Sequence, residues 1–340
     1  MTKIMNDSLS ELGERGIISQ LILPLMSRDF GNILLDDCAV FTAPDTSPLL
    51  FTTDQGPSRT FMEILEVGTP SDLAHFHVTM NVSDIAAMGG QPLGMLLVLS
   101  LTRTDTIDYL RKYLEGISDA MSDYRLRLLG GDTKQSRMRS TTITAIGQAS
   151  SRGVLTRSGA KPGDLIYVVG PPLGTSVASL IHAARAKLRG GSLDVSRPHA
   201  QVSAGLQLVE SGFCTSCMDM SDGLLASAEQ LADTSGVTFR IDLEKVPLAQ
   251  NPLGTDSAKW KNFNVNVGGD YGLIFTGTTP IADVARKMGA IYLGIVEERP
   301  KQGTGLCEAD LIRSGVTLNV WEQFRTVGSI SDELKSFVAP

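Results

Sequence analysis

The sequence predicts a two-domain α/β protein, and three observations support this fold class. Strand-like and helix-like segments alternate in both halves of the chain. The length of 340 residues, with 42% hydrophobic residues, is sufficient for two domains that each bury a core. The polar segment 152–164 (RGVLTRSGAKPGD) is rich in glycine, and such segments typically mark boundaries. We therefore predict an N-terminal domain over residues 1–150 and a C-terminal domain over residues 151–340.

Four strands and two helices are predicted in the first half. Apolar and alternating runs predict the strands, at 48–53, 93–101, 126–130 and 141–148. A helix is predicted over 71–88, because Thr69-Pro70-Ser71-Asp72 supplies residue types that start helices. A second helix is predicted over 105–122, where five apolar residues share one face: Ile107, Leu110, Leu114, Ile117 and Met121. The strand at 126–130 is predicted to end in a glycine turn at Gly130-Gly131-Asp132.

The second half repeats the alternation. Strands are predicted at 165–170, 237–243, 271–276 and 291–296. Helices are predicted over 176–188 and 221–232, and the second would be capped by Ser221 or Asp222.

Composition limits the possible partners and the cellular location. The net charge of −7 argues against nucleic acid, whose binding requires basic surface. The longest apolar run, 93–101, is too short to span a membrane. Four cysteines are too few for a disulfide framework. We expect a cytoplasmic protein without nucleic-acid or membrane partners.

The cysteines and histidines give no transition-metal site that spacing alone identifies. Cys214 and Cys217 form a single C-x-x-C without a second pair, which favours buried thiols over zinc. His75 and His77 are two residues apart on a predicted helix and so do not share a face.

Six aspartates stand in short turn-like motifs, most of them flanked by glycine, serine or threonine, namely Asp37, Asp54, Asp84, Asp132, Asp219 and Asp222. Mg²⁺ prefers carboxylate oxygens and often bridges them to substrate phosphates. Any one of these aspartates is equally consistent with a helix cap or a turn. All six together favour Mg²⁺-nucleotide chemistry.

Several neighbouring groups could complete a phosphate site. Ser83-Asp84 and Ser221-Asp222 look like helix entries, whose free N–H groups suit phosphate. Gly131 and Asp132 form part of a glycine turn with an acid, although no Walker A loop is present. Arg157 could reach nucleotide phosphates or could be ordinary solvated surface.

The motifs DDCAVF, TTD, NVSDIAAMGGQP, GGDT, LTRSGAKPGD, MDMSDGL and GGDYGLIFTG follow one another along the chain. In this order they resemble the motif series of the thiamine-monophosphate kinases, within the PurM-like (aminoimidazole-ribonucleotide-synthetase-like) superfamily. The similarity extends from about residue 12 to residue 321. It implies a two-domain α/β fold and a homodimer whose N-terminal domains form a shared β-barrel.

The resemblance also implies an activity and a set of site residues. The kinases transfer the γ-phosphoryl group of ATP to thiamine monophosphate with several Mg²⁺ ions; whether K⁺ is needed stays open. The implied metal ligands are Asp37, Thr52, Thr53, Asp54, Asp84, Asp132, Asp219 and Asp222. The implied ATP contacts are Gly131, Asp132, Arg157 and Ser221.

The acceptor side departs from the family pattern. Leu35 replaces a glycine, Phe61 a substrate-contacting histidine, and Phe76 a common lysine. Gly269 and Gly272 replace two glutamates, the first of which contacts substrate in the family. Phe324 stands near a C-terminal aromatic position, so the expected substrate contacts are Phe61, Gly269 and Phe324. Two alternatives therefore stay open: a kinase of this fold for another small phosphorylated acceptor, and a nucleotide-binding relative without turnover.

Overall fold

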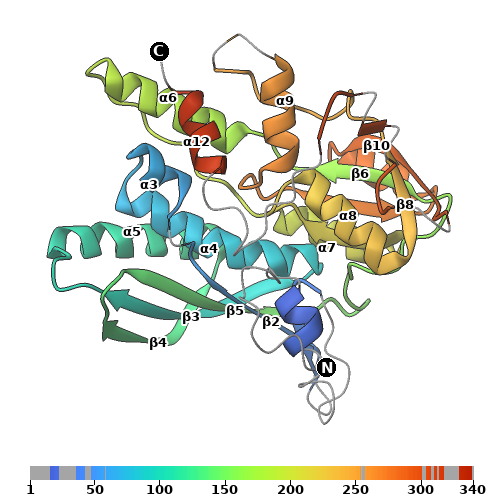
Figure 1. Ribbon diagram of the computed structural model, residues 1–340. Coiled ribbons are helices and arrows are strands. Elements are labelled where there is room, and N and C mark those ends of the chain that lie inside the picture. Colours follow the sequence, from blue (N-terminus) through green and yellow to red (C-terminus); the bar gives the residue numbers. More distant parts are fainter. Residues whose placement is uncertain are drawn as a thin grey trace, which may run out of the picture.

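The computed structural model describes residues 16–22, 36–42, 47–57, 59–252, 254, 257–300, 304–307, 310–311, 314–317 and 329–338. Two five-stranded sheets organise these residues, one in each half of the chain, with helices packed against both (Figure 1). The mixed α/β fold class predicted from the sequence is confirmed. Within the described residues, no helix combines the length and the apolar character that crossing a membrane requires.

The first sheet has the strand order β1-β2-β5-β3-β4. Its strands are β1 (Ala39–Phe41), β2 (Leu49–Gln55), β3 (Gln91–Leu101), β4 (Arg127–Gln135) and β5 (Ser140–Gln148). Only the β3–β4 pair in it is parallel. Helices α4 (Pro70–Ala87) and α5 (Ile107–Tyr124) lie on one face, with the short α3 (Phe61–Leu65) beside them (Figure 1). A π-helical turn (Ile18–Ile22) precedes this sheet in the chain.

The sequence determines where α4 and α5 begin. Thr69 and Asp72 form a capping box at the start of α4, and Pro70 occupies its first turn. Thr106 accepts a hydrogen bond from the Tyr109 N–H and caps α5. The helices cross closely at Gly116, where a Cβ atom would lie 2.1 Å from the Ser71 carbonyl oxygen. Both helices were predicted from the sequence to within about two residues.

The second sheet is antiparallel throughout, with the order β7-β9-β6-β10-β8. Its strands are β6 (Leu165–Val169), β7 (Cys214–Asp219), β8 (Val237–Ile241), β9 (Leu273–Gly277) and β10 (Ile291–Glu298). The helices of this half are α6 (Thr175–Leu188), α7 (Val202–Ser211), α8 (Leu224–Ser235), α9 (Ser257–Asn266), α10 (Ile281–Lys287) and α12 (Ser329–Ser336).

Helix α4 joins the two halves. It packs against β2, β3 and β5 of the first sheet and against α7 and β7 of the second half. At the α4–α7 crossing, Gly205 approaches so closely that a Cβ atom would lie 1.9 Å from the Ala86 carbonyl oxygen. Helix α4 also contacts β7 directly, so Asp84 near the end of α4 comes close to Asp219 at the end of β7.

Three local predictions are wrong. Strand β4 does not end at Gly130 but continues through Asp132, because it pairs in parallel with β3 as far as Gln135. Helix α8 begins only at Leu224, with Gly223 at its N-cap and no side-chain cap. Asp84 does not open a helix; it lies in the last turn of α4, where helix-terminal N–H groups are not available.

Candidate active site

Three aspartates, two of them buried and Asp84 partly buried, meet between the two halves. Asp37 precedes β1, Asp84 lies in the last turn of α4, and Asp219 ends β7. One carboxylate oxygen from each lies within 4.8 Å of those of the other two. The sequence predicted all three as metal ligands, and the fold brings them together from three distant segments. We call them the carboxylate centre.

Neighbouring side chains hold each carboxylate in place. The Thr52 hydroxyl donates to Asp84 Oδ2 at 2.6 Å, and the Ser221 hydroxyl donates to Asp219 Oδ1 at 3.0 Å. Arg157 Nη2 donates to Asp37 Oδ1 at 2.5 Å. These contacts fix the direction of the three side chains through one oxygen each.

The remaining oxygens make the carboxylate centre suitable for a cation. Asp37 Oδ2 and Asp219 Oδ2 are buried and have no hydrogen-bond partner in the part of the chain described. Buried carboxylate oxygens normally require a donor or a cation. Hard oxygen ligands of this kind are those that Mg²⁺ prefers.

The pKa values show the same need for positive charge. Burial raises the pKa of Asp37 to about 7, although the Arg157 guanidinium opposes the shift. Burial and the charges of Asp219, Asp54 and Asp37 raise the pKa of Asp84 well above its usual value. Burial also raises the pKa of Asp219. Without a cation, the centre therefore takes up protons that a metal would displace.

Asp54 and Asp222 lie around the same centre, beside Tyr271. Burial raises the pKa of the Tyr271 phenol, and the next contributions come from the charges of Asp219, Asp54, Asp84 and Asp222. The backbone N–H of Asp54 donates to Asn81 Oδ1 at 3.2 Å, which ties the end of β2 to α4. Five of the six motif aspartates are thus grouped in one region.

Three predicted residues lie elsewhere in the subunit. The Thr53 hydroxyl donates to the Ile143 carbonyl at 3.1 Å, on the face of β2 opposite to Thr52. Gly131 and Asp132 lie on β4, three strands away from β2 and so about 14 Å across the sheet. The Asp132 carboxylate is half exposed and pairs with Lys134 at 3.0 Å.

The residues on the acceptor side that depart from the family pattern lie in different environments. Phe61 begins α3 and packs in the apolar cluster that includes α6. Gly269 has a φ of +104°, and a Cβ atom built there would meet no atom within 4 Å. At Gly272 a Cβ atom would lie 2.6 Å from Met220 Cε, so Met220 fills the space next to it. Phe324 lies outside the described residues.

Sequence reasoning missed two members of the site. Asp36 Oδ1 accepts a hydrogen bond from the Arg157 backbone N–H, and the paired acids of DDCAVF were the available signal. Tyr271, in the motif GGDYGLIFTG, lies near the charges of Asp54 and Asp219 and has a φ of 52°. Arg157, expected at nucleotide phosphates, is placed against Asp37, with its Nη1 donating to Gln230 Oε1 at 3.2 Å.

Comparison with known proteins gives consistent matches over both halves. The family model for the AIR synthase related protein N-terminal domain matches residues 35–149, and that for the C-terminal domain matches residues 161–268. A thiamine-monophosphate kinase of Haemophilus influenzae is 33% identical over 71% of this chain and 74% of its own length. One of Pyrococcus horikoshii is 34% identical over 67% and 72%.

Solved structures agree with these sequence matches. The structure named "AaThiL complexed with AMPPCP and TMP" has a TM-score of 0.73 at 27% identity and covers 89% of this chain and 95% of that one. The thiamine monophosphate kinase of Aquifex aeolicus has a TM-score of 0.68 at 25% identity, covering 88% and 100%.

Proposed function

Because this chain belongs to the thiamine-monophosphate kinase family, we propose that it transfers the γ-phosphoryl group of ATP to thiamine monophosphate, giving thiamine diphosphate and ADP. A related protein has been solved in complex with AMPPCP and TMP, which supports this pair of substrates. The observation that carries the proposal here is the carboxylate centre of Asp37, Asp84 and Asp219.

Phosphoryl transfer from ATP requires positioning of the substrates and neutralisation of their charge rather than a protein nucleophile. Mg²⁺ held by Asp37, Asp84 and Asp219, with Asp54 and Asp222 beside them, would neutralise the phosphates of donor and acceptor. The partly buried Arg157 guanidinium pairs with Asp37 and opposes the rise in its pKa that burial causes, so Arg157 favours the carboxylate form that would bind a metal. Thr52 and Ser221 fix the carboxylates, so the site is organised before substrates bind.

A different phosphorylated acceptor is the second candidate, and one observation favours it. Gly269 and Gly272 carry no carboxylate for a cationic thiazolium, and Met220 fills the space at Gly272. Loss of one charged hydrogen bond typically costs about 1.5–3 kcal/mol, or roughly ten- to a hundredfold in affinity. The metal and nucleotide part of the site is the same for both candidates.

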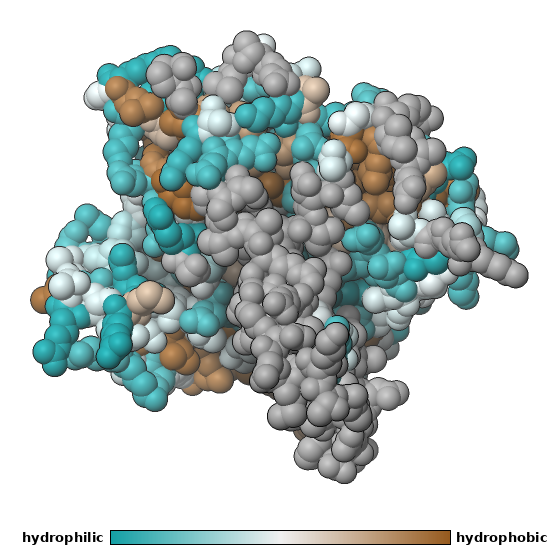
Figure 2. Space-filling view, in the orientation of Figure 1, coloured by the Kyte–Doolittle hydropathy of each residue, from teal (hydrophilic) through white to brown (hydrophobic). Residues whose placement is uncertain are grey.

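We further propose a homodimer that covers the first sheet. Strand β4 is exposed along its length, and Figure 2 shows apolar surface over this part of the molecule. Several large apolar side chains of the sheet are exposed, namely Phe41, Leu93, Leu96, Leu128 and Leu129. An exposed apolar patch of this kind supports an interface. Gly131 and Asp132, on the same strand, would then act at the carboxylate centre of the partner subunit.

A direct assay tests the activity. Purified protein is incubated with ATP, Mg²⁺ and thiamine monophosphate, with free thiamine as the control acceptor, and thiamine diphosphate is measured by chromatography. Formation of thiamine diphosphate from the monophosphate alone is expected. ATP binding by calorimetry without any product would instead favour the second acceptor.

Mixing two inactive variants tests the dimer. Asp84→Asn and Asp132→Asn each disable one side of the proposed shared site. The mixture should recover up to about a quarter of wild-type activity if the two residues serve the same site from different subunits. Absence of recovery in a mixture shown to exchange subunits would contradict the shared site.

A further inference from the structure

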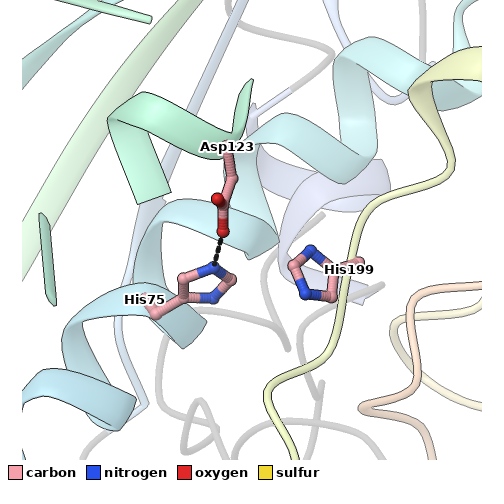
Figure 3. Close-up of side chains that lie close together, drawn as sticks. All are labelled: His75, Asp123 and His199. Carbon is pink, nitrogen blue, oxygen red and sulfur yellow. Dashed lines mark hydrogen bonds and ion pairs between the residues drawn. The ribbon is translucent and has the colours of Figure 1, made fainter. Parts of the chain in front are cut away.

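A second group of metal-ligating side chains lies away from the carboxylate centre. His75 on α4, Asp123 in the last turn of α5, and His199 in the segment before α7 point toward one another (Figure 3). One ligand atom from each lies within 4.8 Å of those of the other two. His75 Nε2 is 3.1 Å from Asp123 Oδ2, and the two imidazole rings are 5.2 Å apart. His75 is fully buried, whereas Asp123 and His199 are open to solvent.

The surrounding hydrogen bonds orient His75. Its Nδ1 atom is 3.3 Å from the Thr79 hydroxyl, one turn further along α4. Metal-binding histidines usually donate their second ring N–H to such an oxygen, which fixes the tautomer. Without a metal, the His75 Nε2–H donates to Asp123. A metal ion would replace this proton, and Nδ1–H would then donate to Thr79.

The same network fixes the backbone on both sides of His199. The Thr79 hydroxyl donates to the Pro198 carbonyl at 3.3 Å, and the Ala200 N–H donates to the Tyr124 hydroxyl at 3.0 Å. Thr79 and Tyr124 are themselves 2.9 Å apart. The third ligand is therefore held near the other two although its side chain is exposed.

We propose that His75, Asp123 and His199 bind a transition-metal ion of the Zn²⁺ class, with water in the fourth position. Ligands about 2.1 Å from a tetrahedral zinc ion lie roughly 3.4 Å from one another. The His75–Asp123 separation of 3.1 Å is already close to this value, and His199 needs only a small side-chain movement. Two imidazoles and one carboxylate suit Zn²⁺, whereas Mg²⁺ prefers oxygen ligands alone.

A metal here would connect the two halves of the chain. His75 and Asp123 belong to the helices that cover the first sheet, and His199 to the segment leading into α7 of the second half. Ion pairs already join the same elements, since Arg197 contacts Asp72 at 2.8 Å and Asp119 at 3.0 Å. The bound ion would stabilise this junction independently of the phosphoryl-transfer site.

Zinc binding to the whole protein tests the proposal. Zn²⁺ titration is followed by calorimetry, and Co²⁺ binding by visible absorption, both with excess Mg²⁺ to occupy the carboxylate centre. His199→Ala and Asp123→Asn should each weaken Zn²⁺ binding by at least about tenfold and alter the Co²⁺ spectrum. His182→Ala, which removes an exposed histidine on α6, is the matched control and should bind as the wild type does.

Two results would overturn the proposal. One is the absence of Zn²⁺ binding that persists in excess Mg²⁺. The other is equal Zn²⁺ affinity in the wild type and in both site variants. Because the readouts are binding and absorption, they do not depend on whether the protein phosphorylates thiamine monophosphate.

Discussion

Asp84→Asn should change stability and turnover in opposite directions, because the carboxylate centre supports catalysis but its negative charges repel one another. Asp84 has two close carboxylate neighbours, Asp37 and Asp219, and accepts a hydrogen bond from Thr52. Asparagine keeps the shape and can accept the same hydrogen bond through its carbonyl oxygen. The substitution therefore removes one negative charge and changes little else.

The distance between the carboxylate oxygens sets the size of the expected gain in stability. At 4.8 Å or less and an effective dielectric constant of about 20, two ionised carboxylates repel by at least roughly 3.5 kcal/mol. Protonation at neutral pH relieves part of this repulsion, because the pKa values are raised. We expect Asp84→Asn to stabilise the metal-free protein by about 1–3 kcal/mol, or a rise in melting temperature of about 2–6 °C.

Turnover should change in the opposite direction. Metal ions typically supply several kcal/mol of charge stabilisation in the transition state. Losing about 4 kcal/mol of it lowers the rate roughly a thousandfold.

Thermal unfolding and product formation are measured on the same preparation, with and without Mg²⁺. Asp108→Asn, at an exposed position on α5, is the control: it removes only a surface ion pair with Lys112, so turnover should not change and the melting temperature should fall by no more than about 1 °C. A variant that melts several degrees below the wild type, or one that keeps full activity, would refute the reasoning.

Three other predictions follow from the same region. The pKa of Asp37 is raised from 3.8 to about 7 in the folded protein, so its contribution to stability is fully present below pH 4 and is lost as the pH rises through 7. Stabilisation by Mg²⁺ should grow over that range, and Asp37→Asn should weaken the pH dependence in thermal melts without removing it, because the pKa values of Asp84 and Asp219 are also raised. Arg157→Gln should weaken ATP binding roughly ten- to a hundredfold in calorimetry, because the buried Asp37 loses its ion pair; unchanged affinity would count against this role. Gly269→Glu should lower stability by about 1–3 kcal/mol, since its φ is +104°, yet tighten binding of thiamine monophosphate; unchanged affinity in a folded variant would favour another acceptor.

Local structure was largely predictable from the sequence. Helix α4 follows from the residue types that start it at Thr69–Asp72, and helix α5 from its single apolar face. The end of β4 was not predictable, because the glycines suggested a turn while parallel pairing with β3 extends the strand. At Gly131 a Cβ atom would lie 1.9 Å from the Leu97 carbonyl oxygen, so glycine serves close strand packing there.

The site was predictable as a set of residue types but not as an arrangement. Asp37, Asp84 and Asp219 could be selected as acids in short motifs, whereas their approach depends on how α4 packs against β7. Arg157 illustrates what the sequence does not predict about the site. Its position suggested a phosphate contact, and only the folded structure shows that it neutralises Asp37.

The proposed zinc site was hidden from the sequence for the same reason. His75 and His77 were correctly judged not to share a helical face, and His77 instead contacts Tyr113 at 2.6 Å. The partners of His75 are Asp123 and His199, which come from distant segments. Spacing rules for metal sites consider ligands close in sequence and therefore cannot find such a set.

Both proposed metal sites use helix α4, and its geometry determines how they interact. His75 and Asp84 are nine residues apart, which places them about 13.5 Å apart along the helix and on opposite faces. The separation exceeds the screening length of roughly 8 Å at physiological ionic strength, and solvent reaches the proposed zinc site through the exposed Asp123 and His199. Zn²⁺ at His75 should therefore leave turnover in excess Mg²⁺ nearly unchanged while raising the melting temperature. A fall in turnover that His199→Ala prevents would show instead that α4 transmits strain between its two faces.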